Sequence, residues 1–136
     1  MNLNPSSIRA EQKISIYPEQ LTQPLIIQGS TRGIIAAQEI VQTKNTVTGV
    51  CNGYVNAQPN YLLDLQAFFP YLKLEVNSQA DTTIIIKNSE GVWCNDDSAT
   101  TNPLIAGQWQ AGLYQVWIGS YYQNSDINYQ IKLTKN

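Results

Sequence analysis

Apolar and polar side chains alternate at every second position in three stretches of the chain, residues 71–77, 113–119 and 127–134. In the first stretch, Leu72 and Val76 fall on one face, and the charged side chains fall on the opposite face. A period of two places successive side chains on opposite faces of a β-strand, with one face buried and the other in water. Strands of this kind build a two-layer β-sandwich.

Further short runs, rich in β-branched and aromatic residues, are separated by Gly, Asn, Pro and Asp, which favour turns. Together with the alternating stretches, these runs are 25–28, 33–41, 54, 61–66, 71–77, 82–87, 92–94, 113–119 and 127–134. Short strands at regular spacing predict an all-β, antiparallel fold in a single domain. Residues 34–42 are the one stretch compatible with a helix, but their β-branched content favours a strand.

The first 24 residues have no sustained period and contain three prolines, Pro5, Pro18 and Pro24. We expect residues 1–24 to form an irregular N-terminal leader segment, with one short strand at 14–17. The β-sandwich domain is expected to span residues 25–136.

Composition excludes several classes of function. Charged residues make up only 13% of the 136 residues and the formal net charge is −2, so we expect no nucleic-acid partner. No apolar run approaches the roughly 20 residues of a membrane-spanning helix, so we expect no membrane span. The chain has no His, which excludes His-based nucleophiles, acid–base groups and zinc sites. Hydrolysis by a carboxylate pair would need a spacing that the sequence does not single out, so we predict that the protein is not an enzyme.

The two cysteines, Cys51 and Cys94, each lie among small polar residues and glycine. This setting favours a disulfide that ties two loops together, and two unrelated free thiols are the alternative. Disulfides persist in oxidising compartments, so we expect a periplasmic or extracellular protein. The N-terminal residues contain no secretory signal, which alone favours the cytoplasm, and we expect that a leader has been removed.

The segment 81–97 predicts a β-hairpin, because a strand, a Ser-Glu-Gly turn and a return strand follow one another. The hairpin would bring acidic and amide side chains to one end of the sandwich. The candidate metal ligands are Asp81, Asn95, Asp96, Asp97 and Asn102. Their oxygens would suit Ca²⁺, which takes about six to eight oxygen ligands. The alternative, favoured because no calcium-loop spacing is present, is that the aspartates cap turns and that no cofactor is bound.

Aromatic side chains are concentrated in the C-terminal third of the chain. Trp93 adjoins Cys94, so we expect it to pack against the disulfide. Trp117 lies opposite the apolar face of its strand, and Tyr121 and Tyr122 follow it. These three residues are the candidate binding surface for a protein or polysaccharide partner, and packing in the core is the alternative.

Several short motifs between Gly49 and the C-terminus together carry a family resemblance. They are Cys51-Asn52-Gly53-Tyr54, Pro59, Leu72-x-Leu74-x-Val76, Asp81-Thr82-Thr83, Gly91-Val92-Trp93-Cys94-Asn95-Asp96-Asp97, Asn102-Pro103 and Gly112-x-Tyr114-x-Val116-Trp117-Ile118-Gly119-Ser120-Tyr121. This part of the chain resembles the bacterial pre-peptidase C-terminal domain family, in the form found as single modules in cyanobacterial exported proteins. The resemblance implies a jelly-roll-like β-sandwich that serves secretion, targeting or adhesion to a substrate. It also aligns the family's carboxylates with Asp81, Asp96 and Asp97, and some members of the wider fold bind calcium or matrix polymers.

We therefore predict a non-catalytic, exported β-sandwich module that binds or targets through surface loops at 81–97 and through the strand edge at 117–122. One alternative is a calcium-binding protein in which the ion orders the loops of Asp81, Asp96 and Asp97. The other alternative is a carbohydrate-binding module.

Overall fold

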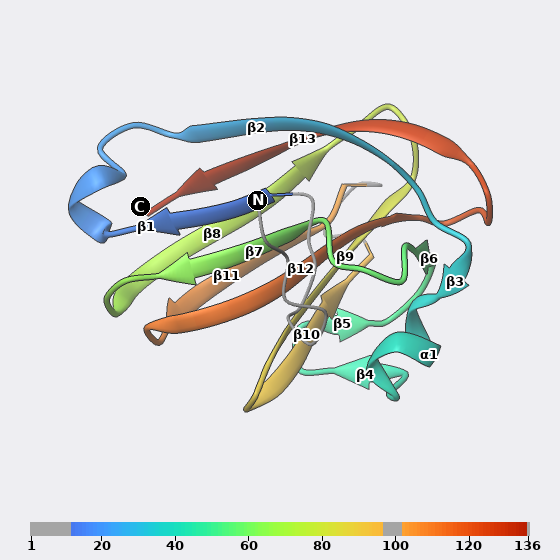
Figure 1. The fold of residues 1–136 in the computed structure, drawn as a ribbon, viewed down its shortest axis with the longest axis horizontal. Helices are drawn as coiled ribbons and strands as arrows, with labels where there is room; N and C mark the ends of the chain where they lie inside the picture. Colours follow the sequence, from blue (N-terminus) through green and yellow to red (C-terminus); the bar gives the residue numbers. More distant parts are fainter. Residues whose placement is uncertain (1–11, 97–101, 136) are drawn as a thin grey trace, which may run out of the picture.

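Two β-sheets pack face to face in the computed structural model, which describes residues 12–96 and 102–135 (Figure 1). One sheet contains the seven strands β1 (Gln12–Ile16), β3 (Ile35–Ala36), β6 (Tyr54–Val55), β7 (Tyr61–Leu65), β9 (Thr82–Asn88), β10 (Gly91–Asn95) and β12 (Gly112–Ser120). The other contains the four strands β2 (Leu25–Arg32), β8 (Phe69–Asn77), β11 (Leu104–Trp109) and β13 (Asp126–Thr134). The predicted all-β sandwich is confirmed.

Strand pairing is antiparallel with one exception among the described residues. The four-stranded sheet has the order β11-β8-β13-β2. In the seven-stranded sheet, β12 is central, with β9 and then β10 on one side and β7 and then β1 on the other. Strands β6 and β3 continue this sheet beside the last residue of β12. The exception is β1, which runs parallel to β7.

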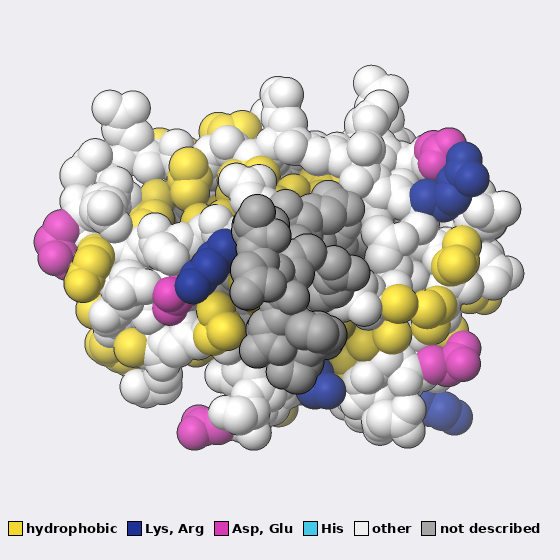
Figure 2. All heavy atoms as spheres, in the orientation of Figure 1, with side chains coloured by type: hydrophobic (Ala, Val, Ile, Leu, Met, Phe, Trp, Pro, Cys, Tyr) yellow, Lys and Arg dark blue, Asp and Glu magenta, His cyan; other side chains and the backbone are white. Residues whose placement is uncertain are grey.

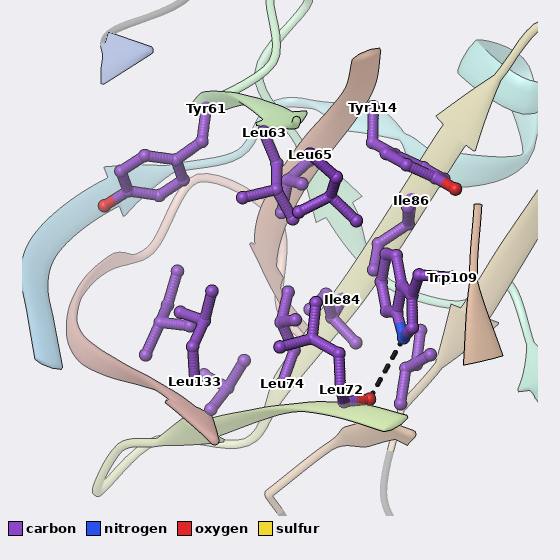
Figure 3. Packing of buried hydrophobic residues seen from close by; sticks show 14 of the residues in the cluster. Tyr61, Leu63, Leu65, Leu72, Leu74, Ile84, Ile86, Trp109, Tyr114 and Leu133 are labelled. Carbon is purple, nitrogen blue, oxygen red and sulfur yellow. Dashed lines mark hydrogen bonds between the residues drawn. The ribbon is translucent and has the colours of Figure 1, made fainter. Parts of the chain in front are cut away.

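The main core fills the space between the two sheets (Figure 3). The alternating residues of β8, β12 and β13 that were predicted to face inward are all buried. They are Leu72, Leu74, Val76, Tyr114, Val116, Ile118, Ile127, Tyr129, Ile131 and Leu133. At one end of this core the Nε1 group of Trp109 donates a hydrogen bond to the carbonyl oxygen of Leu72 at 3.0 Å, so the buried indole has its polar group satisfied.

A second, smaller core lies on the opposite face of the seven-stranded sheet. The helix α1 (Ala37–Val41), the strands β3 and β6, and a hairpin of β4 (Asn45–Thr46) and β5 (Gly49–Val50) gather at one end of the sandwich (Figure 1). The buried residues of this second core are Ala37, Val41, Cys51, Val55, Ile85, Cys94 and Trp117. At this end the seven-stranded sheet is therefore buried on both of its faces.

The strand predicted over residues 33–41 is wrong, because β3 is only two residues long and α1 follows it. Ala37 and Val41 are four positions apart, so both lie on the side of the helical turn that packs on the second core. Gln42 ends the helix with a φ of 60°. β-branched residues lower helix propensity only slightly, and burial against the sheet outweighs that preference here.

An irregular leader was predicted over residues 1–24, of which residues 1–11 lie outside the described part, and residues 12–24 are more regular than predicted. A strand is present where one was expected at 14–17, but β1 begins two residues earlier and ends at Ile16, and it pairs with β7 along its whole length. A 3-10 turn, η1 (Pro18–Gln20), follows it, and Ile16 and Leu21 are buried in the main core. The described part of this segment is ordered because its apolar side chains complete the core at the edge of the sheet.

Two glycines allow β6 to approach its neighbours. A Cβ atom at Gly33 or at Gly119 would collide with the carbonyl oxygen of Tyr54 in β6. The backbone of β6 therefore lies closer to both positions than any other residue type would permit.

The surface is poor in charge. Figure 2 shows charged side chains scattered over one face, most of which consists of uncharged polar and backbone atoms. Arg32 and Asp126 lie opposite each other on β2 and β13, and two hydrogen bonds of 2.6 and 2.7 Å join them. The hydrogen bonds from Arg32 lower the pKa of Asp126. Among the described residues, no helix is both long enough and apolar enough to span a membrane.

Candidate functional site

A disulfide joins Cys51 to Cys94, with their Cα atoms 5.1 Å apart and both side chains fully buried. It ties the segment after β5 to the edge strand β10. The predicted disulfide is confirmed, and the alternative of two free thiols is not realised.

The β4–β5 hairpin is held against β10 beside this disulfide. The hydroxyl of Thr48 donates to the carbonyl oxygen of Cys94 at 2.8 Å, and the hydroxyl of Thr46 accepts from the backbone N–H of Cys94 at 3.0 Å. The Asn95 side chain donates to the Thr48 carbonyl oxygen and accepts from the backbone N–H of Leu104. Asn95 thus connects β10 to the hairpin and to β11.

Trp117 is buried and only 3% exposed, so its predicted place on the binding surface is wrong. It lies directly opposite Ile85 in the pairing of β12 with β9, and it packs in the second core with the disulfide. Its strand face, which we expected to face water, is covered by α1 and its neighbours.

Trp93 lies on β10, an edge strand of the seven-stranded sheet. It packs at the edge of the main core, on the opposite side of β10 from Cys94, and remains partly exposed. The expected packing of Trp93 against the disulfide is therefore wrong. Adjacent residues of a strand point to opposite faces. Cys94 points into the second core, so Trp93 points towards the main core.

A cleft of about 400 Å³ lies beside Trp93, where the edge strands β10 and β11 of the two sheets approach each other. The hairpin tip at Val47 and the β9–β10 turn also contribute to its walls. The lining residues are Val47, Thr48, Asn88, Glu90, Trp93, Ile105, Ala106, Gly107, Gln108, Trp109, Gln110 and Tyr114. Aromatic walls with a few polar groups are typical of small-molecule binding sites, which measure roughly 300–1,000 Å³.

The floor of this cleft is aromatic and well packed. Trp109 and Tyr114 meet nearly edge to face, with ring centroids 5.1 Å apart. The Tyr114 hydroxyl donates to the carbonyl oxygen of Gln110 at 2.8 Å. Burial raises the pKa of Tyr114, and the negative charge of Glu90 raises this pKa further.

Three of the predicted metal ligands, Asn95, Asp96 and Asn102, make side-chain hydrogen bonds with the protein. Asn102 accepts from the backbone N–H of Ser78 at 3.2 Å, and Asp96 accepts from the side chain of Asn52 at 3.0 Å. Asn95 makes the bonds described above. Asn95 and Asn102 thus accept backbone N–H groups, whereas the partner of Asp96 is a side chain, so the turn-capping role expected of the aspartates stays a prediction.

The hairpin does bring the Asp81 end of β9 and the Asp96 end of β10 together, since Ile84 lies opposite Asn95. Asp97 lies outside the described residues. Within residues 12–96 and 102–135, no group of three or more His, Cys, Asp or Glu side chains is placed to hold a metal ion.

Tyr121 and Tyr122 are exposed, by 50% and 67%, and their rings meet edge to face at 5.0 Å. The backbone N–H of Tyr121 donates to the Asp81 carbonyl oxygen. This pair therefore adjoins the Asp81 end of the sandwich, roughly 20 Å along β12 from Tyr114 in the cleft.

A second depression, of about 820 Å³, is broad and lies over the four-stranded sheet. Amide and hydroxyl side chains such as Gln28, Asn77 and Asn128 line it, and its one aromatic residue, Tyr129, is buried. The smaller cleft beside β10 combines aromatic and polar groups and is the better candidate for a site.

Comparisons with known proteins agree with this architecture. No protein-family model matches the chain. An uncharacterized protein of the cyanobacterium Synechococcus elongatus is 26% identical over 86 residues, which make up 60% of this chain and 63% of that protein. The crystal structure of the pre-peptidase C-terminal domain of a collagenase from Bacillus anthracis superimposes with a TM-score of 0.53. That superposition covers 94% of this chain and 100% of the domain, at 13% sequence identity.

The fold therefore belongs to the all-β sandwiches. More particularly, it is similar to that of a pre-peptidase C-terminal domain, as the motifs in the sequence had indicated. At 13% identity this likeness concerns the fold.

Proposed function

We propose that the protein is a non-catalytic β-sandwich module of the exported type, which attaches to a polymeric target outside the cytoplasm. The observation that carries this proposal is the cleft between β10 and β11, because its walls are held by a disulfide and by packed aromatic rings. A site whose walls are fixed before binding loses little conformational entropy when a ligand enters.

The disulfide supports export. Cys51 and Cys94 are both buried beside Trp117, so the bond forms part of the second core. A structural disulfide of this kind persists in the periplasm or outside the cell and is rare in the cytosol.

The residues of the cleft support binding without turnover. Glycoside hydrolysis requires two carboxyl groups on either side of the scissile bond. Among the described residues that line the cleft, Glu90 alone provides one.

Co-sedimentation with insoluble polymers tests this function. The full chain would be incubated with cellulose, chitin, peptidoglycan sacculi and fibrillar collagen, and the reduced and unfolded chain would serve as the control. We expect the folded protein to be retained on at least one polymer without release of reducing sugars or new amino groups. Retention no greater than that of the control would contradict a binding role, and release of products would contradict a non-catalytic one.

Export is tested separately by fractionating the native cells and alkylating the protein without reductant. We expect it outside the cytoplasm with both cysteines unreactive. Recovery from the cytoplasm with two alkylated thiols would reject this part of the proposal.

A further inference from the structure

Trp93 offers an aromatic surface at the mouth of the cleft. It lies on an edge strand and is partly exposed, and its ring is tilted by 55° from that of Tyr114 at a centroid distance of 6.3 Å. Gly91 precedes it by two positions, on the same face of β10. A Cβ atom at Gly91 would lie 3.2 Å from two carbon atoms of the indole ring, so glycine leaves this part of the ring uncovered by its own strand.

The other two rings of the cleft are committed to the protein core. Trp109 and Tyr114 are buried against each other, and the polar group of each is bonded to a backbone carbonyl oxygen. A ligand therefore meets one available aromatic surface, that of Trp93. A single ring suits a flat ligand that stacks on it, whereas a cation is best held by several rings around it.

The polar lining of the cleft consists of amides, a hydroxyl and one carboxylate. Gln108 and Gln110 are exposed, and Asn88 accepts the backbone N–H groups of Glu90 and Gly91 through its Oδ1 atom, which leaves its amide group as a donor. No Lys or Arg is among the described residues of this lining. Such a surface offers both donors and acceptors but no positive charge, so it favours a neutral, polyhydroxylated ligand over an anion.

We propose that this cleft binds the sugar rings of a neutral polysaccharide, with one ring stacked on Trp93. Gln108, Gln110 and Glu90 hydrogen-bond the sugar hydroxyl groups around it. This inference rests on the proposed binding function and specifies its ligand class and its site. It moves the site from the Trp117–Tyr122 strand edge, where the sequence placed it, to the Trp93 cleft.

Titration of the full chain with soluble oligosaccharides tests the inference. The probes are cello-, xylo- and N-acetylated chito-oligosaccharides, with polygalacturonate as an anionic probe and polylysine as a cationic one. Binding is followed by calorimetry and by tryptophan fluorescence, which reports a ligand stacked on Trp93. We expect at least one neutral oligosaccharide to bind, with little dependence on salt, and polygalacturonate to bind more weakly.

Two variants locate the site. Trp93→Ala removes the stacking surface, and Gln108→Arg places a long side chain into the cleft from an exposed position without removing a core contact. We expect each to weaken binding by about tenfold or more, which corresponds to about 1.4 kcal/mol. Tyr122→Ala removes an exposed ring outside the cleft and is the matched control, so its affinity should stay within about twofold of the original, in line with the small effect of most changes away from a site.

Three results would overturn the inference: no binding of any neutral oligosaccharide, unchanged affinity in Gln108→Arg, or salt-sensitive binding of polylysine alone. If the protein still sediments with a polymer while Gln108→Arg has no effect, the binding function stands and this site is rejected. If it sediments with none of the polymers and binds no probe, both proposals fail.

Discussion

Trp117 illustrates how much one side chain contributes when a sheet is buried on both faces. Its ring fills the second core next to the disulfide, yet its Nε1 group has no hydrogen-bond partner among the described residues. Burying an unpaired N–H group costs free energy, while burying the ring stabilises the fold, so the two contributions oppose each other.

Substitution of Trp117 separates these contributions. Trp117→Ala should lower the free energy of unfolding by about 3–5 kcal/mol, because it leaves a large cavity. Trp117→Phe should cost markedly less, about 1–2 kcal/mol, because it removes the unpaired donor and keeps most of the ring. Urea unfolding of both variants measures the difference. Equal losses would indicate that the Nε1 group has a partner, such as a buried water molecule.

Glu90 and Tyr114 are coupled through charge at the edge of the cleft. The pKa of Tyr114 is raised by burial and then by the Glu90 carboxylate, so Glu90→Gln should lower this pKa part of the way towards the ordinary value for tyrosine. The measurement is an absorbance titration of tyrosinate, with Tyr114→Phe identifying the signal of this residue. No change in the Tyr114 pKa would indicate that Glu90 does not act on it.

The same coupling affects stability at alkaline pH. Because the folded-state pKa of Tyr114 is raised, its contribution to stability is fully present below the ordinary tyrosine pKa and is lost as the pH rises through the raised value. Glu90→Gln should therefore make stability fall less steeply with pH above that ordinary value.

At the scale of elements, the disulfide is the covalent link between the β4–β5 region and the β9–β10 hairpin. The two cysteines are 43 residues apart in the sequence. In the chain-entropy model, closing a loop of this length contributes about 4 kcal/mol to stability. The double variant Cys51→Ala with Cys94→Ala should lose about that much in denaturant unfolding.

Reductant provides the control for the disulfide prediction. It should lower the stability of the original protein to near that of the double variant and should leave the variant itself unchanged. Hydrogen exchange should also become faster in β4 and β5, whose contacts with β10 the disulfide reinforces. An unchanged unfolding midpoint in the double variant would contradict a stabilising role.

Local patterns in the sequence predicted several of the strands. The inward side chains of β8, β12 and β13 and the hairpin of β9 and β10 were predicted correctly, because each follows from a local pattern of two or from a turn. The short helix α1 was missed because tertiary packing decides its conformation.

The site was harder to predict, because the second core covers part of a strand face that alternation assigns to water. A signal was nevertheless present: Ile84, Ile85 and Ile86 form a continuous apolar run, which is typical of a strand buried on both faces. Pairing this run with β12 would have placed Trp117 inside. The Trp93 cleft depends on contacts between distant edge strands, which no local pattern specifies.

At the scale of the whole molecule, β1 covers the edge of the seven-stranded sheet. Its removal would expose the edge of β7, and an exposed strand edge promotes association between chains. The apolar contribution of this region comes from Ile16 and Leu21, both buried in the main core.

A paired substitution measures this contribution while keeping the strand. Ile16→Ala with Leu21→Ala should lower the free energy of unfolding by about 4 kcal/mol or more, since each truncation in a core typically costs at least 2 kcal/mol. Removal of residues 1–24 should add concentration-dependent self-association, measured by sedimentation velocity. A truncated protein that stays monomeric and equally stable would show that β1 is dispensable.

The stability of the whole molecule also tests the alternative that the protein binds calcium. Because the oxygens of Asn95, Asp96 and Asn102 already accept hydrogen bonds, we expect the melting temperature to stay within about 1 °C when calcium is added after chelation. A ligand present at 100 times its Kd would stabilise by about 2.7 kcal/mol, so an increase of several degrees would establish a calcium site.

The glycine pair beside β6 has a consequence for recognising related sequences. Gly33 and Gly119 lie far apart in the chain, and either one with a side chain would collide with the same carbonyl oxygen of Tyr54. Both positions must therefore remain glycine for the same reason. The atom that requires this belongs to the backbone, so no substitution at Tyr54 removes it. Divergent sequences that keep both glycines are expected to keep β6 and the helix α1 packed over Trp117, even where the hydrophobic residues differ. In a related sequence that lacks either glycine, we expect β6 and α1 to be packed differently or to be absent.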